Sequence, residues 1–138
     1  MMTLIQAETE IKKRINQFAF VGLGKRDIRL ANQPNDNGEP YEPPKDKPWC
    51  RVSIQYADSN IVGMGNQPCI RKYGIVAIQC FTPKNSGTLA MTELCDAWRS
   101  FLQSFGVSHL EIYKVHAPQS MDDQDFYAKI IRAEFRVN

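Results

Sequence analysis

The sequence predicts an α+β domain in which an antiparallel or mixed β-sheet of roughly four to five strands packs with two α-helices. Three observations predict this class. Two segments carry apolar residues at helical spacing, and several others alternate apolar with polar residues or are apolar throughout. The 138-residue length fits one domain, residues 1–138, and the 43% hydrophobic content is enough to build a core.

The first helix is expected over residues 3–18. Its apolar residues recur at helical spacing along one face, at Leu4, Ile5, Ile11, Ile15 and Phe18. Thr3 is the expected N-cap, and Gln6 stands where a capping box places its second member. Glycines at positions 22 and 24 then break the helical pattern.

A long proline-rich arm is expected over residues 31–48. It holds five of the chain's eight prolines, at Pro34, Pro40, Pro43, Pro44 and Pro48. Loops longer than about 12–15 residues inside a compact domain are usually functional or disordered. Two interpretations stay open: the arm orders on a neighbouring subunit, or it folds over its own domain.

Five strands are expected around and after this arm. Residues 49–56 alternate apolar with polar side chains, and residues 69–81 are apolar on both faces at their centre. The second segment is therefore expected to lie centrally in the sheet, with a possible bulge at Gly74. The other strands are expected over residues 27–30, 109–115 and 126–137.

The second helix is expected over residues 88–104, ending before Gly106. Its apolar stripe consists of Met91, Leu94, Cys95, Trp98, Phe101 and Leu102. Trp98 and Phe101 are expected to be core residues. The turn at residues 82–87 separates this helix from the strand before it.

The four cysteines are expected to be free, buried thiols. Cys50, Cys69, Cys80 and Cys95 each lie far from the next in sequence, so no CxxC pair exists. A four-cysteine zinc site needs such pairs. A cytosolic chain also keeps its thiols reduced.

Several segments approach a catalytic or ligand-binding motif, and each lacks a residue that the motif requires. His109 and His116 have no Cys, Asp or Glu at a metal-ligand spacing, and the acidic turn at residues 121–125 lacks the glycine and glutamate of an EF-hand. The Gly-Leu-Gly segment at residues 22–24 lacks the third glycine of a dinucleotide fingerprint. We therefore expect no catalytic residues, cofactor or metal, and predict that the protein is not an enzyme.

Charge and hydropathy exclude further classes. The net charge of +2 is too small to indicate a nucleic-acid or membrane-surface protein. No apolar run reaches the roughly 18 residues of a membrane span, and the first residues do not form a signal peptide, so the expected place of synthesis is the cytoplasm. Arg71, Lys72 and Tyr73 form one short cationic and aromatic cluster, which is better explained as a strand end.

The middle of the chain carries three short segments in a familiar order. After the proline-rich arm come residues 48–52 (Pro-Trp-Cys-Arg-Val), 71–75 (Arg-Lys-Tyr-Gly-Ile) and 81–88 (Phe-Thr-Pro-Lys-Asn-Ser-Gly-Thr). An amphipathic helix follows. This ordered set, from about Pro40 to Leu102, resembles the tail terminator (tail completion) proteins of long-tailed bacteriophages.

The resemblance implies a structural virion protein with a tail-terminator-like fold. Such proteins form a hexameric ring at the end of the tail tube, at the head–tail junction. The ring ends tube polymerisation and offers the surface that joins the tail to the head-completion or connector protein. It binds no cofactor, and DNA passes through its lumen without sequence-specific binding.

A cyclic ring uses a heterologous interface, so each subunit needs two different complementary patches. The arm is expected to contribute to one of them, and Trp and Arg are types enriched at interface hot spots. The candidate interface residues are Trp49, Arg51, Arg71, Pro43 and Pro44.

Three other functions stay open. The chain is alternatively a head–tail connector or neck subunit, or a tail tube protein, because these share small α and β folds and ring symmetry. A small nucleic-acid-binding domain would use Arg71, Lys72 and Tyr73. An enzyme would need a cysteine–histidine site assembled in space, since no sequence context marks a nucleophile.

Overall fold

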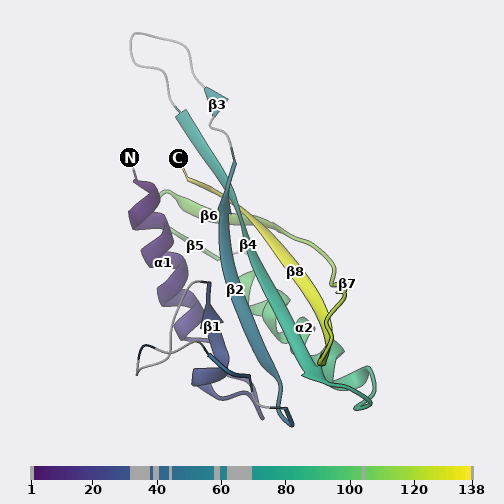
Figure 1. Cartoon of the computed structure of the whole chain (residues 1–138). Helices are drawn as coiled ribbons and strands as arrows, with labels where there is room; N and C mark the ends of the chain where they lie inside the picture. Colours follow the sequence, from purple (N-terminus) through teal and green to yellow (C-terminus); the bar gives the residue numbers. More distant parts are fainter. Residues whose placement is uncertain are drawn as a thin grey trace.

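The computed structural model describes residues 2–31, 38, 41–43, 45–57, 60–61, 70–103 and 105–137. It confirms the α+β class: two helices pack with one mixed sheet (Figure 1). The helices are α1 (Leu4–Asn16) and α2 (Leu89–Leu102), and a 3-10 turn covers Lys25–Asp27. The strands are β1 (Ile28–Leu30), β2 (Trp49–Tyr56), β3 (Asn60–Ile61), β4 (Ile70–Pro83), β5 (Gly106–Val107), β6 (Leu110–Val115), β7 (Gln119–Met121) and β8 (Phe126–Val137).

The sheet has more strands than the sequence predicted. Its eight strands run in the order β1-β2-β4-β8-β6-β5, with β3 beside β4 and β7 beside β8. Among the described strands, β1 and β2 form a parallel pair and the other pairs are antiparallel. The additional strands β3, β5 and β7 contain two or three residues each, too few to show an alternating pattern.

The long strand β4 lies between β2 and β8, which confirms its predicted central place. Figure 1 shows these three strands running along the length of the molecule with α2 behind them. The start of α1 and the end of β8 lie at the same end of the molecule. The sheet therefore forms one layer and the helices form the other.

Helix α1 begins with the predicted capping box. The backbone N–H of Gln6 donates to the Thr3 hydroxyl at 3.1 Å, and the backbone N–H of Thr3 donates to the Gln6 side-chain oxygen at 2.9 Å. Ala7, Ile11 and Ile15 are buried on the inner face of the helix. Phe18 follows the helix and stacks on Trp98 with ring centroids 3.7 Å apart, which ties α1 to α2.

Helix α2 buries the predicted stripe, namely Met91, Leu94, Cys95, Trp98 and Leu102. Phe101 is only partly buried and packs at the edge of the core. Its ring lies under the guanidinium of Arg14, 3.9 Å from the ring centroid, and Arg14 also donates to the Phe101 carbonyl at 2.9 Å. These contacts hold the end of α1 against the end of α2.

The predicted bulge at Gly74 is wrong. Gly74 pairs regularly with Tyr56 on one side and with Phe135 on the other. A Cβ at Gly74 would lie 2.3 Å from the Phe135 ring and 2.6 Å from the Gln55 carbonyl oxygen, so glycine is required by close packing. The irregularity lies instead in β6, between Ile112 and Lys114.

The thiols of Cys50, Cys80 and Cys95 are free and buried, as predicted. Cys69 lies outside the described residues. No helix within the described part of the chain is long and apolar enough to cross a membrane.

Candidate interaction surface

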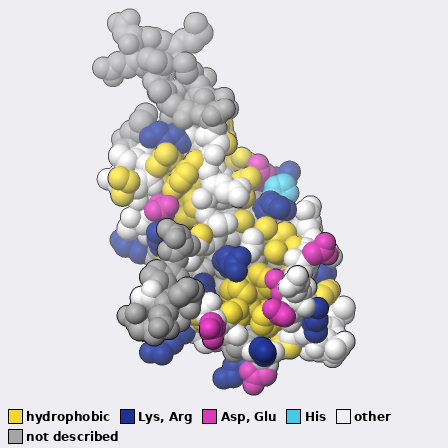
Figure 2. Space-filling model, in the orientation of Figure 1, with side chains coloured by type: hydrophobic (Ala, Val, Ile, Leu, Met, Phe, Trp, Pro, Cys, Tyr) yellow, Lys and Arg dark blue, Asp and Glu magenta, His cyan; other side chains and the backbone are white. Residues whose placement is uncertain are grey.

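The two helices cover one face of the sheet, and no described helix covers the other. The main core joins both helices to residues of one strand face, including Val52, Ile78 and Ile131. Successive residues of a strand point to opposite faces, so the alternate residues form a second surface, called the open face here. Its central members are Arg51, Ser53 and Gln55 in β2, Ile75, Ala77 and Gln79 in β4, and Ile130, Arg132 and Glu134 in β8. Figure 2 shows hydrophobic and charged side chains interspersed over the sheet in the orientation of Figure 1.

One end of the open face carries a second, smaller hydrophobic cluster. It consists of Trp49, Phe81, Phe126 and Ala128, with Tyr41 and Met121 packed against it, and we call it the aromatic cluster. The Trp49 and Phe81 rings stack with centroids 4.2 Å apart and an interplanar angle of 9°. Phe126 meets both rings edge-on, at 6.0 and 6.1 Å. Such offset and edge-on contacts are the favoured aromatic geometries.

Arg51 is exposed at this end of the open face. Its guanidinium lies 5.2 Å from the Trp49 ring centroid and 5.8 Å from that of Phe81. It also donates to the Gln79 side-chain oxygen at 3.4 Å. The cation is thus held over the aromatic cluster in contact with solvent, where a partner can reach it.

The middle of the arm, at Tyr41, folds onto its own domain. Tyr41 packs against the aromatic cluster, with its ring centroid 5.6 Å from that of Trp49. The Tyr41 hydroxyl donates to Asp27 at 2.8 Å, and the Arg29 guanidinium lies 4.6 Å from the Tyr41 ring. Burial, followed by this hydrogen bond, raises the pKa of Tyr41 well above its usual value. Tyr41 therefore fixes this segment to the strands that begin and end the arm.

Away from the aromatic cluster, the open face carries several polar side-chain pairs. Arg132 donates to Gln119 at 3.1 Å, and Nε2 of His116 lies 2.8 Å from a carboxylate oxygen of Glu134. Arg136 pairs with Glu111, and its guanidinium lies 5.2 Å from the ring of Tyr113. These partly exposed pairs contribute little to stability each, but they fix the charge pattern that a partner meets.

The structure places four of the five candidate interface residues, at least in part. Trp49 is only 4% exposed, so it supports the surface from below. Arg51 is exposed and Pro43 is half-buried. The backbone of Arg71 pairs with Asn60 in β3, and its side chain and the whole of Pro44 lie outside the described residues.

Sequence reasoning missed several members of this surface. Tyr41 and Arg29 approach the aromatic cluster from segments that carried no strong pattern, and only the fold brings them together. Phe81 was seen as the last apolar residue of a strand and as the first residue of the segment 81–88, and neither observation placed it against Trp49. Apolar and polar residues alternate along β8, and this pattern places Arg132 on the face opposite the core. Arg132 could therefore be assigned to this surface from the sequence.

His116 and the described thiols lie on opposite faces of the sheet. Glu134, which pairs with His116, is the register partner of Ile75 on the open face. Cys50 and Cys80 belong to the core on the helix side. Among the described residues, no group of three His, Cys, Asp or Glu side chains is placed to hold a metal ion.

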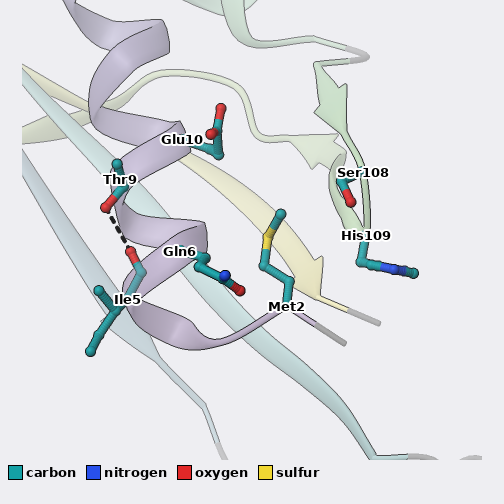
Figure 3. A pocket seen from close by; sticks show the side chains of 7 residues that line it. All are labelled: Met2, Ile5, Gln6, Thr9, Glu10, Ser108 and His109. Atoms are coloured by element: carbon teal, nitrogen blue, oxygen red, sulfur yellow. Dashed lines mark hydrogen bonds between the residues drawn. The ribbon is translucent and has the colours of Figure 1, made fainter.

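A hollow of about 410 Å³ lies beside the first half of α1 (Figure 3). Its lining comes from α1 and from the β5–β6 turn, and comprises Met2, Ile5, Gln6, Thr9, Glu10, Ser108 and His109. Glu10 is paired with Lys13 at 3.4 Å, and the exposed His109 points away from α1 in Figure 3. Ile5 is 79% exposed on the rim. This open, mixed lining suits surface contact better than enclosure of a small ligand.

The acidic turn is organised by its own backbone. A carboxylate oxygen of Asp123 accepts hydrogen bonds from the backbone N–H groups of Asp125 and Phe126, at 3.1 and 3.0 Å. Lys84 donates to the carbonyl of Gln124. The turn is thus an exposed connection between β7 and β8, as its sequence predicted.

Comparison with known proteins finds similar folds but indicates no function. No protein-family model and no curated protein matches the sequence. Four chains of known structure match. One has a TM-score of 0.63 and 11% sequence identity, and the match covers 100% of this chain and 97% of that one. Its name states no activity, so the similarity shows that the whole fold has been seen before and shows nothing further.

Proposed function

We propose that this chain is a structural virion protein that caps the tail tube of a long-tailed phage. The supporting observation is that two of the sequence segments resembling tail terminators meet in space. Trp49, from the first segment, stacks on Phe81, from the third, at 4.2 Å. The pairing explains why both aromatic residues stand in the ordered set, because each buries the other.

The cap works as a ring of identical subunits, with six as the number that the resemblance implies. Each subunit needs two different complementary patches in such a ring. The open face supplies one patch, since it mixes apolar side chains at its centre with the exposed Arg51 at one end. The ring ends polymerisation of the tube protein and presents its other side to the head-completion or connector protein.

The cap needs no chemistry beyond binding. DNA passes through the ring, and a near-neutral subunit with a net charge of +2 suits a conduit that does not grip phosphates. The protein is made in the bacterial host cytoplasm and ends at the head–tail junction of the virion. Its partners are copies of itself, the tube protein and the connector.

Electron microscopy of particles assembled without this protein tests the proposal. We expect abnormally long tails, or tails of varied length that are detached from heads. Complementation with the wild-type chain should restore one tail length. Absent tails would instead identify the tube protein, and normal tails on DNA-filled heads would refute a role in the tail.

The arm offers a more local test. Removing residues 32–40 spares Tyr41, which packs in the aromatic cluster, so the shortened chain should fold. If the arm contributes to an interface, the shortened protein stays monomeric and fails to cap tails. Normal tail length and infectivity would show instead that the arm serves only its own domain.

A further inference from the structure

Three connecting segments reach the same end of the sheet just before their strands begin. β1 and β2 are parallel neighbours, so residues 25–27 and 45–48, which precede them, arrive at one level of the sheet. β8 is antiparallel to β4, and β4 is antiparallel to β2, so residues 122–125, which precede β8, arrive at that level too. At this end β1 lies at one lateral edge of the sheet and β7 lies at the other (Figure 1).

The part of this end beside β1 and β2 carries an excess of positive charge, and we call it the basic corner. Residues 25–29 and 45–51 hold six cationic side chains and two acidic ones. Of the two acids, Asp27 accepts the hydrogen bond from Tyr41 and Asp46 is exposed, while Glu42 adds one more exposed acid nearby in sequence. The exposed cations of the corner are Lys25, Arg26, Lys45, Lys47 and Arg51.

The connection between β7 and β8 carries the opposite charge. Its three carboxylates, those of Asp122, Asp123 and Asp125, belong to exposed residues. Asp123 accepts hydrogen bonds from its own turn, whereas no ion pair or hydrogen bond within the described chain engages the carboxylates of Asp122 and Asp125. Lys84 brings one cation to the turn through its hydrogen bond to the carbonyl of Gln124. The turn is therefore acidic overall.

The basic corner and the acidic turn lie apart within one subunit. β1, β2, β4, β8 and β7 are successive neighbours at this end, so two to four strand spacings separate the two charged parts. At about 4.8 Å a spacing, the separation is about 10–20 Å, which exceeds the Debye length of about 8 Å at physiological salt. No ion pair among the described residues joins them. Each charge is therefore available to another chain.

The strand beside the acidic turn also leaves one side open. β7 pairs with β8, and no second strand in the described part of the chain pairs with it. Gln119 and Ser120 in β7 are exposed. An edge strand presents backbone N–H and C=O groups to which a neighbouring chain can bind. A second chain can therefore approach the acidic turn from the side of this edge.

We propose that the acidic turn of one subunit docks against the basic corner of a second copy, so that identical chains associate head to tail. The proposal rests on the proposed function for the ring, because a ring closes through one repeated heterologous contact. The two charged parts lie towards opposite lateral edges at one level of the sheet, so each copy can use both at once. Complementary charge then steers the encounter and fixes its register.

The contact should depend strongly on salt. A single exposed ion pair contributes little, so association needs several pairs acting together. The Debye length falls from about 10 Å at 0.1 M salt to about 3 Å at 1 M, which screens all of these pairs. Purified wild-type chain should therefore sediment at low salt with a mass greater than twice the 15.8 kDa of one chain, and as a monomer at about 1 M salt.

Two charge-reversal variants of the full chain test the surfaces. Lys45→Glu with Lys47→Glu reverses charge in the basic corner, and Asp122→Lys with Asp125→Lys reverses it in the acidic turn. Asp123 is kept because it accepts the backbone hydrogen bonds of the turn. In sedimentation velocity at low salt, each variant alone should be a folded monomer, because its two surfaces now repel.

Mixing the two variants gives the decisive result. In an equimolar mixture, every corner meets a turn of opposite charge on the other variant, so the mixture should associate again. A single chain carrying all four changes should do so as well. Glu93→Lys with Asp96→Lys makes the same change of charge on exposed positions of α2 and should associate like the wild type.

Several results would overturn the contact. These are a wild-type chain that is monomeric at low salt, folded variants that each associate normally, or a mixture that stays monomeric. A mass that stops at two chains would indicate a two-fold pair in place of the head-to-tail contact. The proposed function is tested separately by tail length. Charge-dependent association together with normal tails in particles lacking the protein would refute the cap and leave the contact standing.

Discussion

At the scale of single residues, burial and hydrogen bonding differ between side chains that lie close together on one strand. Trp49 and Arg51 are two positions apart on the same strand face, yet one is buried and the other is exposed. Trp49 also carries a cost, since its indole N–H is buried without a hydrogen-bond partner among the described residues. An unsatisfied buried donor reduces stability relative to an apolar group of similar shape.

This difference gives a prediction for Trp49. Trp49→Ala should lower the free energy of unfolding by about 3–5 kcal/mol, because it leaves a cavity beside Phe81 and Phe126. Trp49→Phe keeps a stacked ring and removes the unpaired donor, so it should cost less than about 1.5 kcal/mol. Urea unfolding of both variants measures the contrast. Equal losses would mean that the indole N–H is satisfied in solution.

Tyr56 provides a test by pH. Burial, followed by the hydrogen bond from its hydroxyl to Glu8 at 3.0 Å, raises the pKa of Tyr56 from 10.0 to about 12. The folded chain therefore favours the protonated phenol. The resulting stabilisation is fully present below pH 10.0, the value for an unperturbed phenol, and is lost as the pH rises to about 12.

Tyr56→Phe removes this group and leaves the other tyrosines in place. The difference in the free energy of unfolding between the wild type and Tyr56→Phe should shrink as the pH rises from 10.0 to about 12. Denaturant unfolding at several alkaline pH values measures it. A difference that is independent of pH across this window would contradict the assigned contact with Glu8.

At the scale of elements, the long segments were predictable and the short ones were not. The bounds of β2 and β8 are those that alternation predicts, because alternate residues are buried, Cys50 and Val52 in β2 and Ala133, Phe135 and Val137 in β8. β5 and β7 have two and three residues, and their place depends on the strands beside them. The bulge prediction at Gly74 failed because the ring that fills its space, Phe135, is 61 positions away in sequence.

The sequence also did not indicate which face of the sheet the helices cover. β4 is apolar at its centre on both faces, so its pattern placed it centrally without assigning either side to α1 or α2. Tyr41 illustrates the same limit within the candidate surface. Nothing in residues 41–43 indicates that this part of the arm packs on Trp49, since that contact depends on where β1 and β2 meet.

The start of α1 is an element-scale feature with a direct test. Thr3→Ala removes the hydroxyl that accepts from Gln6 and should lower the free energy of unfolding by about 1 kcal/mol. Thr9→Ala is the matched control. The Thr9 hydroxyl only donates to the carbonyl of Ile5 within the same helix, so its loss should change stability by less than about 0.5 kcal/mol. Equal effects of the two changes in thermal or urea unfolding would refute the capping role.

At the scale of the whole molecule, the two-layer build leaves one large face of the sheet for partners. In the proposed ring this face has to stay soluble until assembly, and its mixture of Arg, Glu and Gln with Ile and Ala is suited to that. The partner must then match both the apolar centre and the pattern of charge. Arg51 is the most informative position, because it is exposed, charged and held in place.

Arg51→Glu should separate folding from assembly. The change removes exposed cation–aromatic contacts, each about 0.5–1 kcal/mol, and one long exposed hydrogen bond to Gln79, so the variant should fold with nearly the stability of the wild type. If the open face joins subunits or binds the tube, the reversed charge prevents that contact, and particles made with the variant have long or unjoined tails. Glu93→Lys reverses one exposed charge on the outer side of α2 and should leave assembly normal. If Arg51→Glu gives tails of normal length while Glu93→Lys does not, the contact surface lies on the helix layer.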